Sequence, residues 1–233
     1  MGQPDELERI KTDLIGMVTH DLKNPACNVL GYVDLLLENP DPLTDRQRQL
    51  VSRVRDNAAF MLELIGDILE TSRIEEGKLR LVASRQDLRE LVRDAVDRNA
   101  FLAADKSITL VTEVPDDPLP ITLDRNKVMQ VFANLISNAI KFSREGTTVR
   151  VGARQVLGAI EAWVADQGQG MHESDLPQLF HKFSRTSVKS TRGEKSTGLG
   201  LFIVAEVLRL HHGTIRVDTE PGKGSTFTFT LPG

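Results

Sequence analysis

The passage with the most evident chemistry is His20-Asp21-Leu22-Lys23-Asn24-Pro25. A neutral imidazole is a good nucleophile, and an acceptor beside one ring nitrogen fixes the tautomer that it presents. Asp21 could take the proton of His20, and Asn24, one helical turn onward, could position a water. Because Pro25 lacks an N–H, we expect the helix to bend here. Taken alone, a histidine beside an acid is more often a solvated residue, and the proline a mere kink.

A second group of polar residues shares one helix face. Asn134, Asn138 and Lys141 fall at i, i+4 and i+7, with apolar residues on the other side. Carboxamide oxygens are hard ligands that suit Mg²⁺ bridged to phosphates, and Lys141 adds positive charge for a phosphate. Without further context, two asparagines on a helix surface are at least as good an interpretation.

Two glycine-rich passages could hold a nucleotide. Asp166-Gln167-Gly168-Gln169-Gly170 follows an apolar stretch, so its carboxylate stands at a strand end and could accept a hydrogen bond from an adenine amino group. A lone pattern of this kind is more often a turn. Thr197-Gly198-Leu199-Gly200-Leu201 opens a helix, whose free N–H groups and dipole favour phosphate.

The stretch 184–196 before the second passage is polar and basic. It carries one acid, Glu194, and the cations Arg185, Lys189, Arg192 and Lys195. Because it lacks apolar periodicity, we interpret it as a mobile lid that closes over phosphates. The alternative is an ordinary solvated loop.

Two long amphipathic helices are expected in residues 1–80. Prolines interrupt the helical spacing at 38–42, Thr44 and Gln47 form a capping box, and Gly77 is a plausible end. One helical hairpin buries each apolar stripe on one side only, so we predict a homodimer closed as a four-helix bundle. The alternative is a monomeric hairpin docked on the rest of the chain.

Residues 85–233 alternate between helical and strand patterns. We expect helices at 88–102, 124–142 and 199–210, and strands at 107–114, 147–156, 159–165, 214–218 and 225–231. This order predicts an α/β sandwich, a mixed sheet with helices on one face. Residues 82–85 are the expected hinge between the two parts.

Composition narrows the class of protein. The chain has 233 residues, a formal charge of −4 and a pI near 5.8, which argues against nucleic-acid binding. The single cysteine, Cys27, excludes an intrachain disulfide and a cysteine-cluster zinc site. No apolar run approaches the ~18–20 residues that span a bilayer. We therefore expect a cytoplasmic protein, or the cytoplasmic portion of a longer, membrane-bound one.

In this order, the motifs resemble those of the sensor histidine kinases of two-component signalling. The corresponding segments are the H box (20–25), the N box (134–142), the G1 box (166–170), the F box (180–183), the G2 box (198–201) and the last glycine motif (222–227). The resemblance implies a dimerisation and histidine phosphotransfer domain at 1–80. It implies a Bergerat-type ATP-binding domain at 85–233.

The resemblance also implies roles. His20 would receive the γ-phosphoryl group, with Asp21 as the acid and Asn24 helping to remove phosphate from a regulator. Asn138 with Asn134 would hold Mg²⁺, Lys141 would meet phosphate, and Asp166 would read adenine. The implied ATP site further includes Phe142, Gly168, Gly170, Arg185, Lys189, Thr197, Gly198, Leu199 and Gly200. The implied partners are a response regulator receiver domain and an upstream sensor domain or protein.

Three positions depart from the usual family pattern. Asp21 stands where glutamate is common, Lys23 where arginine is common, and Ser196 where a further glycine is frequent. Three rival functions remain open: an ATPase clamp of the same superfamily, a Ser/Thr kinase of this fold, and a nucleotide-sensing dimeric scaffold with an inert His20.

Overall fold

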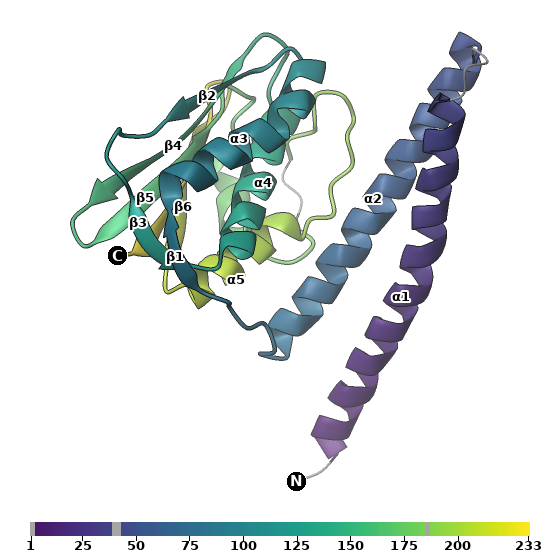
Figure 1. The fold of residues 1–233 in the computed structure, drawn as a ribbon, viewed down its shortest axis with the longest axis horizontal. Coiled ribbons are helices and arrows are strands. Elements are labelled where there is room, and N and C mark those ends of the chain that lie inside the picture. Colours follow the sequence, from purple (N-terminus) through teal and green to yellow (C-terminus); the bar gives the residue numbers. More distant parts are fainter. Residues whose placement is uncertain (1–2, 39–42, 185–186) are drawn as a thin grey trace. The chain divides into compact units, whose positions relative to one another are not determined.

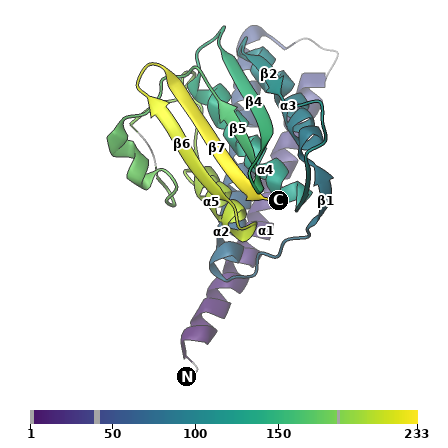
Figure 2. The same cartoon turned by 90° about the vertical axis from the view of Figure 1, so that its left-hand side faces the viewer.

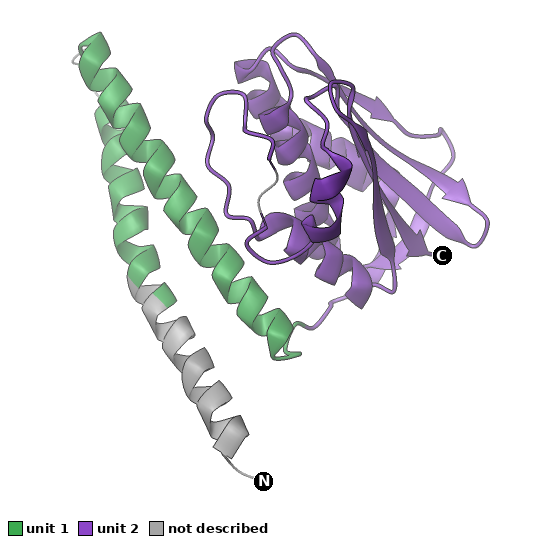
Figure 3. Cartoon of the chain, turned by 180° about the vertical axis from the view of Figure 1, so that it is seen from behind, with its two compact units in different colours: residues 1–79 green, residues 80–233 purple. Residues whose placement is uncertain are grey.

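The computed structural model describes residues 3–38, 43–184 and 187–233, and side chains from residue 22 onward together with that of Thr19. The chain divides into two compact units, residues 1–79 and 80–233 (Figure 3). Each unit is described by itself below.

The first unit is a hairpin of helices α1 (Gln3–Glu38) and α2 (Asp45–Glu75), which lie side by side (Figure 1). The predicted capping box is confirmed: Gln47 N donates to Thr44 Oγ1 at 3.3 Å, and Thr44 N donates to Gln47 Oε1 at 2.9 Å. Helix α2 ends just before Gly77, which has a positive φ of 62°. Helix α1 remains helical through Pro25, so the proline does not end it.

The hairpin leaves much apolar surface uncovered. Its described buried apolar residues are Ala26, Val33, Ala58, Ile65 and Ile74. Exposed apolar residues recur every seven residues on both helices, at Leu22, Val29 and Leu36 on α1 and at Val54, Met61 and Ile68 on α2. A repeat of seven is the spacing of a seam between packed helices.

The second unit is built on a five-stranded sheet in the order β2-β4-β5-β7-β6 (Figure 2). Its strands are β2 (Thr109–Glu113), β4 (Thr148–Val156), β5 (Ala159–Ala165), β6 (Thr214–Glu220) and β7 (Gly224–Pro232). Strand β2 runs parallel to β4, and every other neighbouring pair is antiparallel. The predicted mixed sheet is confirmed.

Three helices cover one face of this sheet: α3 (Leu88–Asp105), α4 (Arg125–Phe142) and α5 (Gly200–Leu210) (Figures 1 and 2). The core lies between the helices and the sheet, where the rings of Phe132 and Phe229 meet edge to face at 5.3 Å. The predicted helices therefore all form on the expected side. Among the described helices, none has the length and apolar character needed to cross a bilayer.

Three short elements were not predicted. Strands β1 (Ser84–Asp87) and β3 (Pro120–Leu123) pair as a separate two-stranded sheet, and η1 (Glu173–Gln178) is a 3₁₀ helix. Strand β1 shows no alternation of exposed and buried residues, and the alternation in β3 extends over only four residues. Because β1 starts at Ser84 and Val82 N donates to Asp124 Oδ2 at 2.8 Å, most of the expected hinge is held in the second unit.

Candidate functional site

Helix α4 presents the predicted polar face. Its start is fixed by Asp124, whose Oδ1 accepts from Asn126 N at 3.0 Å and from Lys127 N at 3.1 Å. Its apolar side is fully buried in the core, which holds the rotation of the helix. Asn134, Asn138 and Lys141 consequently remain partly exposed on the other side. Within the described part of the chain, neither asparagine carboxamide forms a hydrogen bond with another residue.

The start of α5 lies against this face. A Cβ placed on Gly200 would lie 2.7 Å from Asn134 Oδ1, so glycine at this position lets the carboxamide lie against the start of α5 without shifting. The preceding turn is shaped by Gly198, with φ of 72°, and by Thr197, whose Oγ1 accepts from Leu199 N at 3.2 Å. The side chain of Leu199 is fully buried and anchors the turn. The structure thus brings the N-box and G2-box segments together.

Asp166 stands at the end of β5, as predicted. Its Oδ1 accepts from Gly168 N at 2.8 Å and from Ser225 N at 3.1 Å. Burial nevertheless raises the pKa of Asp166 to about 6, against the lowering effect of these two amide hydrogen bonds. Among described residues, Oδ2 has no hydrogen-bond partner, so it is free to accept from a ligand.

Glycines hold the loop after Asp166 close to its neighbours. A Cβ on Gly168 would lie 2.8 Å from the carbonyl oxygen of Phe142, at the end of α4. A Cβ on Gly170, which has φ of 64°, would lie 1.9 Å from the carbonyl oxygen of Glu220. The loop therefore packs against both the end of the N-box helix and the β6–β7 turn.

The described part of the predicted lid, residue 184 and residues 187–196, lies against the same region. Lys141 Nζ donates to the carbonyl of Lys195, and Gln169 Nε2 donates to the carbonyl of Lys189 at 2.8 Å. The side chain of Lys189 is exposed. Arg185 lies outside the described residues.

Another cation of the lid, Arg192, is paired with two acids of the protein. Arg192 donates to Asp105 Oδ2 and to Glu145 Oε1, both at 2.9 Å. Its guanidinium is therefore paired with protein carboxylates in this structure. The sequence could not show this, because both acids lie more than forty positions away in the chain.

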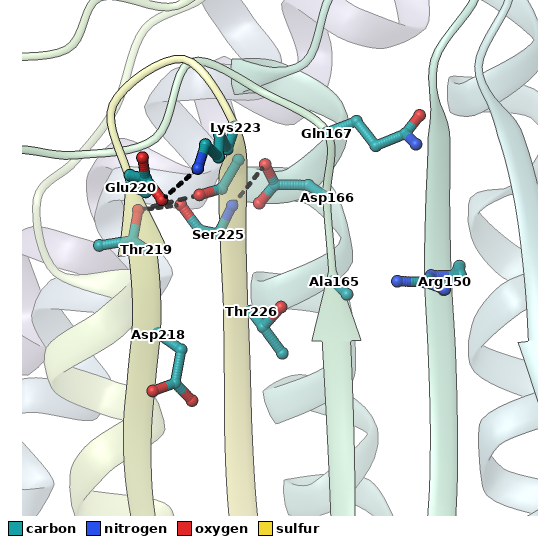
Figure 4. Close-up of a pocket in the computed structure, with 11 residues that line it drawn as sticks. Arg150, Ala165, Asp166, Gln167, Asp218, Thr219, Glu220, Lys223, Ser225 and Thr226 are labelled. Atoms are coloured by element: carbon teal, nitrogen blue, oxygen red, sulfur yellow. Dashed lines mark hydrogen bonds and ion pairs between the residues drawn. The ribbon is translucent and has the colours of Figure 1, made fainter.

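A separate hollow of about 460 Å³ opens on the other face of the sheet (Figure 4). Arg150, Ala165, Thr226 and Asp218 form one row across its four strands, because they are register partners. Asp166 also borders it, but no N-box or G2-box residue does. With its mixed charges and no helix N-terminus, this hollow lacks the groups that bind a triphosphate, so we place the candidate nucleotide site on the helix side.

The predicted phospho-acceptor residues lie on α1, in the first unit. His20 and Asp21 belong to the helix, but their side chains lie outside the described part of the structure. Asn24 lies one turn after His20 and is exposed, whereas the neighbouring Thr19 is buried.

Several residues of the site were missed at the sequence level. Ser225 donates its amide to Asp166, and Thr219 Oγ1 accepts from Met171 N at 3.0 Å, just after the G1 box. Lys106 is buried beside the end of α4. Only Ser225 had a signal, since it belongs to the last glycine motif.

Two family models match the chain. The model of the His Kinase A (phospho-acceptor) domain matches residues 10–77. The model of the histidine kinase-, DNA gyrase B- and HSP90-like ATPases matches residues 123–233.

Curated relatives are sensor kinases. The sensor protein GacS of Pseudomonas syringae pv. syringae is 36% identical over 234 residues, covering 97% of this chain and 25% of GacS. The sensor-like histidine kinase SenX3 of Mycolicibacterium smegmatis is 31% identical, covering 97% of this chain and 58% of SenX3. The chain thus spans about a quarter of GacS and just over half of SenX3.

Solved structures similar to this chain are also of histidine kinases. Full-length ShkA in complex with AMPPNP is 29% identical with a TM-score of 0.75, covering 94% of this chain and 45% of ShkA. The Acinetobacter baumannii histidine kinase AdeS, at 21% identity and a TM-score of 0.63, shares the fold, covering 91% of this chain and 97% of the AdeS chain. With a phospho-acceptor hairpin followed by an ATPase-like domain, the chain belongs to the histidine kinases.

Proposed function

We propose that this chain is an ATP-dependent protein histidine autokinase that phosphorylates His20 and passes the phosphoryl group to an aspartate of a response regulator. One observation carries the proposal. The N-box face of α4 adjoins both glycine-rich passages, at Asn134 against Gly200 and at Phe142 against Gly168. This nucleotide-type site belongs to a chain that also has a phospho-acceptor hairpin.

The nucleotide is bound from its two ends. Asp166 Oδ2 accepts from the adenine amino group, while Oδ1 stays fixed by two backbone amides. The free N–H groups at the start of α5 bind phosphate oxygens. Lys141 exchanges the carbonyl of Lys195 for a phosphate oxygen. The glycines 168, 170, 198 and 200 keep the backbone close to the ligand.

The asparagines of α4 fit a magnesium ion. Asn138 and Asn134 would hold the ion through two hard carboxamide oxygens on one helix face. When bound, the ion neutralises charge on the triphosphate. The chain's own part is to hold these two oxygens next to the start of α5, where the phosphates lie.

The transfer step is a substitution at phosphorus. A neutral ring nitrogen of His20 forms a bond to the γ-phosphorus as the bond to the β–γ bridging oxygen breaks, and ADP leaves with that electron pair. Asp21 accepts the proton from the other ring nitrogen, so that the ring, which becomes cationic as the N–P bond forms, ends neutral. Asn24 positions the water that later hydrolyses the phosphorylated regulator.

The active form is a homodimer. The exposed apolar residues that recur every seven positions on α1 and α2 match the seam of a four-helix bundle. The hairpin of a second copy would supply the other two helices of that bundle. Exposed apolar stripes on both helices favour this arrangement over a hairpin that stays alone in water.

The proposal is tested with γ-labelled ATP and Mg²⁺. We expect label on the protein in a bond that is labile in acid and stable in alkali, located in the tryptic peptide 12–23, which contains His20. An ATPase clamp would release the label as phosphate, and a Ser/Thr kinase would give an acid-stable bond. A scaffold would bind ATP without transfer. Any of these three results would overturn the proposal.

A further inference from the structure

The end of α3 carries a buried lysine that none of the motifs accounts for. The side chain of Lys106 is only 3% exposed. Its ammonium donates to the carbonyl of Ile140 at 2.8 Å and to that of Lys141 at 2.9 Å, and it pairs with Glu194 Oε1 at 3.0 Å. A buried ammonium is costly unless every proton is bonded, and here all three protons have acceptors.

Two of these acceptors are helix-end carbonyls. The last four C=O groups of a helix lack partners within it, and the helix dipole makes this end negative. Lys106 therefore caps the C-terminus of α4 with a full positive charge. The capped residues include Lys141, whose own ammonium faces the lid. Lys106 thus fixes the backbone from which the phosphate-binding cation of the N box projects.

The third acceptor belongs to the lid. Glu194 Oε2 also accepts from Arg192 N at 2.9 Å, and the carbonyl of Glu194 accepts from Ser190 Oγ at 2.9 Å. Thr191 also attaches this segment to the end of α4, because its Oγ1 donates to the carbonyl of Ser143 at 2.9 Å. Residues 190–194, together with Lys195, whose carbonyl accepts from Lys141 Nζ, therefore form a compact turn attached to the end of α4, the 190–195 turn.

Another lid contact differs from this one in burial. Glu145 binds Arg192 of the same turn, but its side chain is 65% exposed. Exposed ion pairs contribute little because water screens them and because the side chains lose entropy. In the Lys106–Glu194 ion pair, by contrast, the lysine side chain is buried, so water screens this pair less than the Arg192–Glu145 pair.

We propose that Lys106 and Glu194 are positioning residues, which hold the 190–195 turn and Lys141 in the geometry that receives the ATP phosphates. This inference rests on the proposed autokinase function and deepens it. The pair does not contact the reacting atoms. It acts by keeping the distal half of the lid attached to the N-box helix, so that ATP enters a site whose cations are already placed.

The first test needs no nucleotide. The full-length chain is digested briefly with trypsin, and mass spectrometry measures the rate of cleavage after Lys189, Arg192 and Lys195. We expect Glu194→Ala to raise that rate about tenfold, because the turn opens more often. The control Glu145→Ala removes an exposed acid that pairs with Arg192 of the same turn, and we expect a change below about twofold. Equal rates in the two variants would overturn the proposal.

The second test is the steady-state kinetics of autophosphorylation. Positioning of ground-state contacts predicts that Glu194→Ala raises the KM for ATP roughly tenfold while kcat changes less than about twofold, with partial recovery in Glu194→Gln, which keeps an acceptor. A KM for Glu194→Ala equal to or below that of the wild type would overturn the inference. Lys106→Met should repeat the KM effect if it folds, as checked by circular dichroism.

The two proposals fail in different ways. If wild-type protein transfers no label, the autokinase proposal fails, and the protease comparison still decides whether the pair holds the turn. If wild-type protein is active and Glu194→Ala matches Glu145→Ala in both tests, only the positioning role is wrong.

Discussion

The two units of this chain bury their apolar residues in different ways. In the second unit the helices α3, α4 and α5 close over one face of the sheet, and its largest core side chains, such as Phe132, Leu135 and Phe229, are fully buried. In the described part of the first unit, by contrast, Tyr32 is 68% and Leu35 is 66% exposed. One unit has a complete core, and the other presents apolar surface.

The difference fits a division of labour. A closed core holds a nucleotide site rigidly, since Asp166 and the glycines around it are fixed by backbone contacts from three segments. In the proposed dimer the open seam of the hairpin packs on a second copy, so its packing can change with its surroundings. The predictions below probe each half of this contrast, from the largest expected effect to the smallest.

The largest effect concerns the closed core. Phe229→Ala should lower the free energy of unfolding of the second unit by about 3–5 kcal/mol, because it removes a fully buried ring that packs on Phe132. Calorimetry should show this unit unfolding earlier while the hairpin transition stays in place. A shift of both transitions together would mean that the two cores are not independent.

The open seam of the first unit is probed by Met61→Glu. We expect the dimer to dissociate at least about a hundredfold more readily, because a charge enters the apolar seam. Analytical ultracentrifugation measures the dissociation constant. Gln49→Glu makes the same charge change at an exposed polar position of α2 and should leave the dimer intact. Unchanged dimerisation in Met61→Glu would show that the stripe serves another contact.

Asp166 makes the nucleotide site sensitive to pH. Its pKa of about 6 lies above the unperturbed value of 3.8, so the folded chain holds this proton more tightly than the unfolded chain. The contribution of this group to stability therefore falls as pH rises from about 4 to about 6, by on the order of 2 kcal/mol. The free energy of unfolding of Asp166→Asn, measured with urea relative to that of the wild type, should therefore be higher at pH 7 than at pH 4 by about this amount.

ATP affinity, unlike stability, should increase as pH rises. Only the ionised carboxylate accepts from the adenine amino group without also presenting a proton, so binding should strengthen as pH rises through about 6. Calorimetric titration of wild type and Asp166→Asn checks this. If the two show the same pH dependence, Asp166 does not contact the base, and the ATP phosphates alone account for the trend.

The smallest effect concerns a helix end of the hairpin. Thr44→Ala removes the side-chain half of the capping box and should destabilise α2 by about 1 kcal/mol, measured by thermal unfolding of the first unit. ATP affinity should not change. A loss of ATP binding would contradict the independence of the two units.

Sequence patterns predicted the elements whose signals are local. The Thr44 capping box, the helix at 124–142 and the strands at 147–156 and 159–165 all appear within one residue of where the residue spacing placed them. The N-box and G2-box residues were also expected to share a site, and Asn134 does lie against Gly200.

The contacts that were missed depend on residues far apart in the chain. Lys106 and Glu194 are 88 positions apart, and no periodicity links them. Likewise, nothing local in the sequence reveals that Arg192 pairs with Asp105, 87 positions away. Strands β1 and β3 are stabilised by each other across the chain, and neither has enough residues to show a strand pattern.

The central claim is that the first unit accepts a phosphoryl group which the second unit donates. The most direct measurement compares label uptake from γ-labelled ATP by wild type and by His20→Gln, with ATP affinity measured for both. The account predicts that wild type is labelled in an alkali-stable bond, and that His20→Gln binds ATP equally well but takes up no such label. Equal labelling of both proteins would contradict it.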